Sequence, residues 1–276
     1  MLTLTYQQKR DFHEQGFLHL PGLVSQPMVD EALRRINHHL GAHGMHPDEL
    51  VTMRAQTYCR DIRTSDAIVG LLTQTPAHAL AASLVGGVEQ LPQPTSGQIA
   101  LRFPSPEPTD QPRRKAGLHL DGMYSPHNGV TKGDIHSFTM LASVALSATP
   151  HPYCGNFTVS PGSHHIYEAY FQEHRPDALL HGMPDVEIAP PVQLITQPGD
   201  VVLVHYQVAH SAAPNHSPHV RYACFYRLSV ADHADHKREA MTDIWREWPA
   251  IRDVIAADDA TAESAETSVK TITTRT

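Results

Sequence analysis

The sequence predicts a mainly β protein, an antiparallel sandwich or barrel with flanking helices. Three observations lead to this fold class. Short runs of strand-forming residues, separated by Gly, Pro and Asn turns, fill residues 96–230. Residues 1–90 and 235–254 instead carry apolar residues at helical spacing. We therefore expect one domain over residues 1–255, with helices on either side of a β core.

The composition fits one globular domain. The 276 residues are 41% hydrophobic and 18% charged, which suffices for a buried core. The formal net charge of −8 lacks the basic excess of a nucleic-acid-binding protein. No apolar run approaches the roughly 18 residues of a membrane span, and the first residues turn polar too soon for a signal peptide. Three widely spaced cysteines fit a reducing cytoplasm, and no feature indicates an oligomeric state.

The N-terminal helices have recognisable ends. Thr5 and Gln8 form a plausible capping box, and Gly16 is expected to end that helix. A short strand is expected over residues 17–20, and Ser25 is expected to cap a second helix. Another helix opens at Thr75-Pro76 and is expected to end near residues 86–87.

The β core follows in short segments. Strands are expected over residues 98–103, 136–147, 156–160, 186–195, 200–206 and 221–229. Residues 104–116 and 122–135 interrupt them as long loops, which we interpret either as substrate-selecting lids or as plain surface connections. Trp245 and Trp248 are expected to pack in the C-terminal helix, and residues 256–276 are expected to be a mobile tail.

Two separate segments carry metal-binding residue types. His119 and Asp121 stand two positions apart, so on a strand both side chains point to the same face. Residues 199–210 begin with Gly-Asp, continue as an apolar strand and end at His210. Two imidazoles and one carboxylate form the facial triad of non-heme Fe(II) oxygenases, which leaves three coordination positions open. Because the chain holds 21 histidines, the His-x-Asp pair alone is weak support.

An arginine strengthens this interpretation. Arg221 lies eleven residues after His210 and opens an apolar strand. A guanidinium inside an apolar core requires an anionic partner, and its planar fork suits a carboxylate. A dicarboxylate that binds iron at one end and Arg221 at the other would satisfy it. The alternative is an ion pair between Arg221 and an acidic residue such as Asp200.

Other candidate residues have structural explanations. His164 and His165 follow a Pro-Gly-Ser turn and are expected to cap it or to lie at the surface rather than to form a second metal site. His205 is five residues before His210, so on an extended strand the two face opposite sides, and we do not expect it to bind the metal. The basic run 113–115 is expected to be solvated surface; the alternative is contact with an anionic substrate.

Four stretches together make the sequence similar to a known family. They are residues 12–23 (FHEQGFLHLPGL), His119-Leu120-Asp121, residues 155–164 with their Pro-Gly-Ser-His turn, and residues 199–221 with Gly-Asp, His210 and Arg221. In order and spacing they resemble the phytanoyl-CoA dioxygenase-like family of Fe(II)/2-oxoglutarate-dependent dioxygenases. The resemblance spans roughly residues 5–230.

This resemblance implies a double-stranded β-helix, or jelly roll. It also implies iron ligation by His119, Asp121 and His210, with Arg221 on the far carboxylate of 2-oxoglutarate. Many members carry a serine two residues after the distal histidine, where this chain has Ala212. Ser211, Gln98 or Thr139 are the candidates to replace that serine as co-substrate contacts. The intact carboxylate at position 121 disfavours chlorination, because related halogenases have a small residue there.

The predicted function is that of an Fe(II)/2-oxoglutarate-dependent dioxygenase, with O₂ as the other co-substrate. We expect it to hydroxylate a C–H bond of a small-molecule metabolite, in bacterial specialised metabolism, with release of succinate and CO₂. Two alternatives remain at this stage: a cupin-like metalloenzyme that does not use 2-oxoglutarate, and a non-catalytic jelly-roll binding module. Beyond the metal ligands no catalytic residue is predicted, and the substrate-binding residues are not identified.

Overall fold

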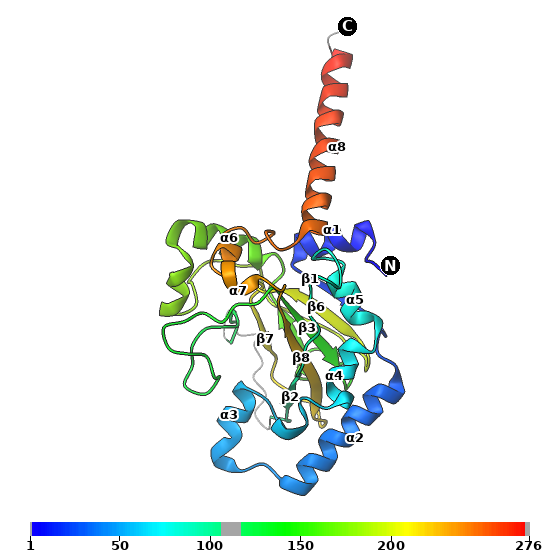
Figure 1. Ribbon diagram of the computed structural model, residues 1–276, viewed down its shortest axis with the longest axis vertical. Coiled ribbons are helices and arrows are strands. Elements are labelled where there is room, and N and C mark those ends of the chain that lie inside the picture. Colours follow the sequence, from blue (N-terminus) through cyan, green and yellow to red (C-terminus); the bar gives the residue numbers. More distant parts are fainter. Residues whose placement is uncertain (1, 106–116, 274–276) are drawn as a thin grey trace.

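The protein is built around two antiparallel β-sheets (Figure 1). The computed structural model describes residues 2–105 and 117–273, with side chains described as far as residue 261. The larger sheet has the strand order β1-β6-β3-β8-β2, and the smaller sheet has the order β5-β4-β7. The larger sheet comprises β1 (Phe17–Leu20), β2 (Gln98–Arg102), β3 (Met140–Ala145), β6 (Val201–His205) and β8 (Arg221–Leu228). The smaller comprises β4 (Phe157–Val159), β5 (Val192–Gln193) and β7 (His210–Ala212).

Side-chain alternation on the central strands divides the core into two layers. On β6, Val202 and Val204 pack in one cluster with Phe157 of the smaller sheet. Val201 and Leu203 point the other way and pack in a second cluster with the helices. The larger sheet is therefore buried on both faces, one against the smaller sheet and one against helices. This arrangement confirms the predicted mainly β sandwich with flanking helices.

Most of the described helices precede the β core in the sequence. The helices are α1 (Tyr6–Gln15), α2 (Gln26–His43), α3 (Leu50–Ala55), α4 (Asp66–Thr73), α5 (Pro76–Ala82), α6 (Ser163–His174), α7 (His233–His236) and α8 (Pro249–Thr273). Short 3₁₀ helices occur at Pro47–Glu49, Arg60–Ile62, Pro176–His181 and Glu239–Met241. In Figure 1, α2, α4 and α5 cover one side of the larger sheet, and α8 extends away from the body.

The predicted helix ends are largely confirmed. The Thr5 side chain accepts from the Gln8 backbone, the Gln8 side chain accepts from the Thr5 backbone, and Gly16 ends α1 at φ 77°. Ser25 precedes α2 as expected. Thr75 caps α5, but that helix ends at Ala82, earlier than predicted. Helices α3, α4 and α6 and the strand β7 were not predicted as separate elements. Helix α3 and strand β7 are short, α4 is almost continuously apolar, and α6 is mostly polar with few apolar residues to mark a period.

The C-terminal region differs from the prediction. A continuous helix over residues 235–254 is wrong: the short helix α7 and a 3₁₀ turn occupy its first part, and α8 begins only at Pro249. Helix α8 then runs through Thr273, so most of the predicted tail is helical. Trp245 and Trp248 pack as predicted, with the Trp248 ring 5.0 Å from that of Phe12 in α1.

No helix in residues 2–105 and 117–273 combines the length and the apolar character needed to cross a membrane.

Candidate metal centre

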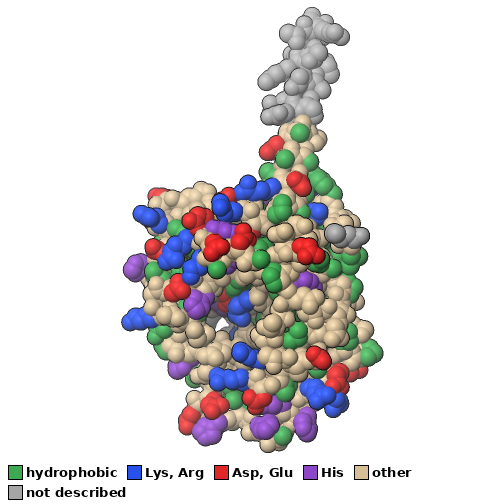
Figure 2. All heavy atoms as spheres, in the orientation of Figure 1, with side chains coloured by type: hydrophobic (Ala, Val, Ile, Leu, Met, Phe, Trp, Pro, Cys, Tyr) green, Lys and Arg blue, Asp and Glu red, His purple; other side chains and the backbone are tan. Residues whose placement is uncertain are grey.

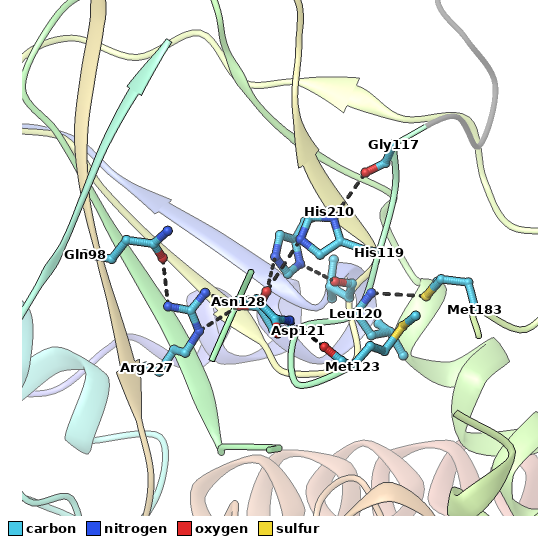
Figure 3. Close-up of polar contacts among 11 residues, drawn as sticks. Gln98, Gly117, His119, Leu120, Asp121, Met123, Asn128, Met183, His210 and Arg227 are labelled. Atoms are coloured by element: carbon cyan, nitrogen blue, oxygen red, sulfur yellow. Dashed lines mark hydrogen bonds and ion pairs between the residues drawn. The ribbon is translucent and has the colours of Figure 1, made fainter. Parts of the chain in front are cut away.

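Three potential metal ligands meet where two chain segments pair. His119 and His210 form an antiparallel bridge, with backbone N–H···O distances of 3.0 and 3.1 Å in the two directions. Asp121 follows on the same segment as His119. One ligand atom from each of the three residues lies within 4.8 Å of the others, and no other such group is found among the described residues. The structure thus brings together the His119, Asp121 and His210 set predicted from the sequence (Figure 3).

Backbone carbonyls orient both imidazoles. The Nδ1 atom of His119 lies 3.1 Å from the carbonyl of Gly117, and that of His210 lies 3.0 Å from the carbonyl of Val208. A carbonyl can only accept, so each Nδ1 carries the proton and each Nε2 presents a lone pair. The two Nε2 atoms lie 3.5 and 3.7 Å from Oδ1 of Asp121. Two neutral imidazoles and one carboxylate oxygen are donors that suit Fe(II), so the residues present fit the predicted metal.

The second oxygen of Asp121 is bound by Arg227, a residue that the sequence analysis missed. The Nε and Nη2 atoms of Arg227 lie 2.9 and 2.8 Å from Oδ2 of Asp121. Burial opposes the charge on Asp121, but the Arg227 guanidinium, together with the imidazoles when their Nε2 atoms are protonated, outweighs it and holds the pKa of this carboxyl well below its usual range. A signal was available: Arg227 lies six residues after Arg221, on the same face of one strand.

The metal-binding group opens onto a cavity of about 430 Å³. Leu141, Phe157 and Phe225 provide apolar wall, whereas Tyr124 and Ser125 provide polar groups. The lining contains four arginines and one acidic residue, Asp121. The arginines are Arg54, Arg102, Arg221 and Arg227. On the face shown in Figure 2, basic side chains gather at the margin of a hollow. The lining is therefore basic although the chain as a whole has a net charge of −8.

One wall of the cavity is the loop predicted over residues 122–135. The Asn128 side chain holds this loop in shape: its amide donates to the carbonyl of Met123 at 2.6 Å, and its oxygen accepts from the Ser125 amide at 3.0 Å. Gln56, next to α3, donates to the carbonyl of His127. This loop lies at the site as expected. Most of the other predicted lid, and the basic run 113–115, fall outside the described residues.

Arg221 is buried and lines the same cavity as the metal-binding group. Its Nε donates to the carbonyl of Gly155 at 2.8 Å and its Nη1 to that of Ala100 at 3.2 Å. Burial, and next the charge of Arg102, lower the pKa of Arg221 to about 10. The alternative partner Asp200 is excluded, because its carboxylate accepts from the Gly22 amide at 2.9 Å and contacts His19 at 2.8 Å.

Arg102 is a second arginine at this end of the cavity, and the sequence analysis missed it as well. It lies opposite Arg221 in the β2–β8 register. Its Nη2 donates to the carbonyl of Ala212 at 2.9 Å, while its buried Nε has no hydrogen-bond partner among the described residues. Burial and the neighbouring charge of Arg54 lower the pKa of Arg102.

The three candidates to replace the missing serine at Ala212 differ in position. Ser211 and Gln98 line the cavity. The amide oxygen of Gln98, however, already accepts from Nη1 of Arg227 at 2.8 Å. Thr139 lies elsewhere: its hydroxyl donates to Glu247 at 2.5 Å and accepts from the Val230 amide. The structure therefore does not bring Thr139 to the site.

The remaining histidines lie outside the metal-binding group. His205 is buried, and its Nε2 donates to the carbonyl of Ile244 at 3.1 Å, in agreement with the prediction that it is not a ligand. His164 is fully buried at the start of α6, so a surface position is wrong for this residue. The Nε2 atoms of His164 and His165 both contact the carbonyl of His13, which ties α6 to α1.

The comparison with protein families agrees with this geometry. The family model described as "Phytanoyl-CoA dioxygenase (PhyH)" matches residues 12–223. The chain belongs to this family, and it is an enzyme of the Fe(II)/2-oxoglutarate-dependent oxygenase class. No curated protein matches the sequence.

Solved structures with the same architecture include three proteins. The first is SnoK, a non-heme alpha-ketoglutarate-dependent carbocyclase from nogalamycin biosynthesis, with 20% identity, a TM-score of 0.52 and coverage of 85% of this chain and 90% of that one. HygX from Streptomyces hygroscopicus, with nickel and 2-oxoglutarate bound, has 17% identity, a TM-score of 0.55 and coverage of 83% and 88%. The epimerase SnoN, in complex with Fe³⁺, alpha-ketoglutarate and nogalamycin RO, has 20% identity, a TM-score of 0.52 and coverage of 81% and 82%. These likenesses confirm the jelly-roll fold predicted from the sequence.

Proposed function

We propose that this protein hydroxylates an unactivated C–H bond of a small-molecule metabolite, using Fe(II), 2-oxoglutarate and O₂. The observation that carries the proposal is one cavity that holds both the His119, Asp121 and His210 group and Arg221, which is buried and forms no ion pair with an acidic residue in the described part of the chain. A structural metal site would have no need of the arginine, because a buried guanidinium without an anion is unfavourable.

Iron and 2-oxoglutarate supply the oxidising chemistry when bound: substrate R–H, 2-oxoglutarate and O₂ give R–OH, succinate and CO₂. The chain supplies position and surroundings for that reaction. His119, Asp121 and His210 hold the metal on one side and leave the cavity side open. Arg221 holds the far carboxylate of the co-substrate, in two-point contact if its free Nη atom takes part.

Arg102 is suited to make the co-substrate contact that many family members make with a serine at the position of Ala212. It lies next to Arg221, and its Nη2 is tied to the carbonyl of Ala212 itself. Its partnerless Nε can be satisfied by a bound carboxylate. Two guanidinium groups on one carboxylate would compensate for the lost hydroxyl, with Ser211 as an additional contact in the lining.

The cavity supports a small substrate. After 2-oxoglutarate is bound, the volume left within about 430 Å³ suits a compact molecule. The apolar walls Phe157 and Phe225, with Tyr124 at the loop, favour a partly apolar body. We place the reaction in specialised metabolism, and the three buried, unpaired cysteines are consistent with a reducing cytoplasm.

The experiment that tests the function is anaerobic. Fe(II) and then 2-oxoglutarate are added to metal-free protein, and the visible metal-to-ligand charge-transfer band is recorded for wild type, His210→Ala and Arg221→Ala. We expect a band in the wild type, no band in His210→Ala and a band that requires far more 2-oxoglutarate in Arg221→Ala. The control is Arg238→Gln, which removes an arginine outside the cavity.

The outcomes separate the alternatives. Fe(II) binding without a band would support a cupin-like enzyme that does not use 2-oxoglutarate. No Fe(II) binding would support a non-catalytic module. Once the band is established, succinate release with candidate metabolites, together with mass spectrometry of the product, distinguishes hydroxylation (a gain of one oxygen atom) from cyclisation or epimerisation.

A further inference from the structure

We infer that Arg227 is a positioning residue that restricts Asp121 to one-oxygen coordination of the metal and so keeps the positions for co-substrate and O₂ open. The inference rests on the proposed metal centre and assigns a role to a residue outside the ligand set.

The two oxygens of Asp121 have separate partners. Oδ1 faces the Nε2 atoms of His119 and His210. Oδ2 points away from them: it accepts a hydrogen bond from Nε of Arg227 at 2.9 Å and lies 2.8 Å from Nη2 in the same ion pair. Figure 3 shows Arg227 on the side of Asp121 opposite the imidazoles. A metal held by the two Nε2 atoms therefore meets Oδ1, while Oδ2 is already bound.

Arg227 is itself fixed from three directions. It belongs to β8, where its backbone pairs with Leu141 of β3. Its Nη1 donates to Oε1 of Gln98 at 2.8 Å, from the neighbouring strand β2. Its guanidinium carbon lies 5.8 Å from the centre of the Phe138 ring, in cation–π range. An arginine held in this way keeps the Asp121 carboxylate in place, and Gln98 contributes by holding the guanidinium.

The physical consequence concerns the number of open positions. A carboxylate free to turn can bind a metal through both oxygens, which would occupy a fourth of six positions and leave two. Chelation by 2-oxoglutarate uses two positions, and O₂ requires a third. Arg227 removes the second oxygen from competition, because a charge-assisted hydrogen bond and the ion pair that contains it must be broken before Oδ2 can reach the metal. Outer partners of this kind typically change metal affinity or activity about 10- to 100-fold.

The alternative role for Arg227 is substrate binding, since it lines the cavity and its side chain is 40% exposed. The two roles differ in what they predict for the enzyme without substrate. A positioning residue affects the metal centre itself, whereas a substrate ligand leaves the metal centre unchanged and raises the KM for the substrate.

The test uses Co(II) bound to the full-length protein with no 2-oxoglutarate or substrate. Co(II) affinity and the intensity of its visible absorption report ligand binding and coordination number. The variants are Arg227→Gln and Arg227→Lys. The matched control is Arg238→Gln, because Arg238 is 41% exposed and also places two nitrogens on one oxygen of an aspartate, Asp177, outside the cavity.

We expect Arg227→Gln to lower the intensity of the Co(II) absorption, because a second carboxylate oxygen raises the coordination number, and to change the Co(II) affinity about 10- to 100-fold, with partial recovery in Arg227→Lys and no change in Arg238→Gln. In an Asp121→Ala background, Arg227→Gln should leave the Co(II) spectrum unchanged, since the arginine acts through the carboxylate. Circular dichroism melting verifies that each variant is folded; if Arg227→Gln does not fold, Gln98→Ala, which removes one support of Arg227, should give a smaller spectral change in the same direction.

Unchanged affinity and spectrum in folded Arg227→Gln would overturn the inference. This result is distinguishable from a failure of the proposed function, which is wild-type protein that binds Co(II) or Fe(II) yet gives no band with 2-oxoglutarate. Wild-type protein without any affinity for Co(II) would overturn both.

Discussion

Arg102 and Arg221 lie directly opposite each other on β2 and β8, and neither forms an ion pair with an acidic residue in the described part of the chain. Two neighbouring guanidinium groups repel each other, and their hydrogen bonds go to backbone carbonyls that carry no net charge. This end of the cavity is therefore suited to bind an anion that comes from outside the protein, such as the carboxylate of a small molecule.

The first prediction concerns how much each of these two arginines contributes to the affinity for 2-oxoglutarate. We expect Arg221→Ala to weaken 2-oxoglutarate binding roughly 100-fold and Arg102→Ala about 10-fold, because charged hydrogen bonds contribute about 1.5–3 kcal/mol each. The measurement is an anaerobic titration of the charge-transfer band. Loss of affinity in Arg221→Ala alone would assign Arg102 a purely structural role.

The second prediction separates a ligand from a buried histidine five residues away. His210→Ala should abolish tight Fe(II) binding, because two ligands remain. His205→Asn should keep the metal affinity and lower the free energy of unfolding by about 1–3 kcal/mol, because His205 bonds to the Ile244 carbonyl and the Gln207 amide. Metal titration and urea unfolding of both variants test this; metal loss in His205→Asn would contradict the assignment.

The third prediction concerns Glu247, a buried carboxylate that joins the C-terminal region to β3. It contacts His233 at 2.6 Å, His236 at 2.9 Å and the Thr139 hydroxyl at 2.5 Å. Glu247→Gln should lower the free energy of unfolding by about 1–3 kcal/mol without changing metal affinity. The exposed Glu89, replaced by Gln, is the control. Equal stability of the two variants in urea would show that the Glu247 contacts are not stabilising.

The fourth prediction is the pH dependence of stability. Burial lowers the pKa of His205 to about 4 and holds that of His164 well below its usual range. Between about pH 6.5 and pH 4 the unfolded chain binds protons at these residues that the folded chain excludes, so the free energy of unfolding falls as pH falls. For His205 alone the loss amounts to about 3 kcal/mol at the acid end.

Urea unfolding at several pH values from 7.5 to 4.5 measures this slope. His205→Asn should be less stable at pH 7.5 but should show a shallower decline towards low pH, because one excluded proton is gone. A decline as steep as that of the wild type would place the acid sensitivity elsewhere.

Contiguous sequence determined much of this protein. The His119 and Asp121 pair, the distal His210 and the following Arg221 are local patterns, and the alternation on β6 and the cap at Thr5 depend on neighbouring residues. Each rests on backbone periodicity or on spacing along one element, so the sandwich and the residues that meet at the site were predictable. The start of the C-terminal helix was misplaced because the apolar residues before Pro249 pack without a helix, with Trp248 on Phe12 of α1, a contact far away in sequence.

Tertiary structure alone decided the partners of the ligands and arginines. Arg227 meets Asp121 across 106 residues, Arg102 meets the carbonyl of Ala212 across 110, and Thr139 turns to Glu247 rather than to the cavity. These contacts depend on strand order and register, which are set by the packing of the whole core. Local patterns in a sequence specify which residues a strand presents on a face, but not which residues on other strands lie opposite them.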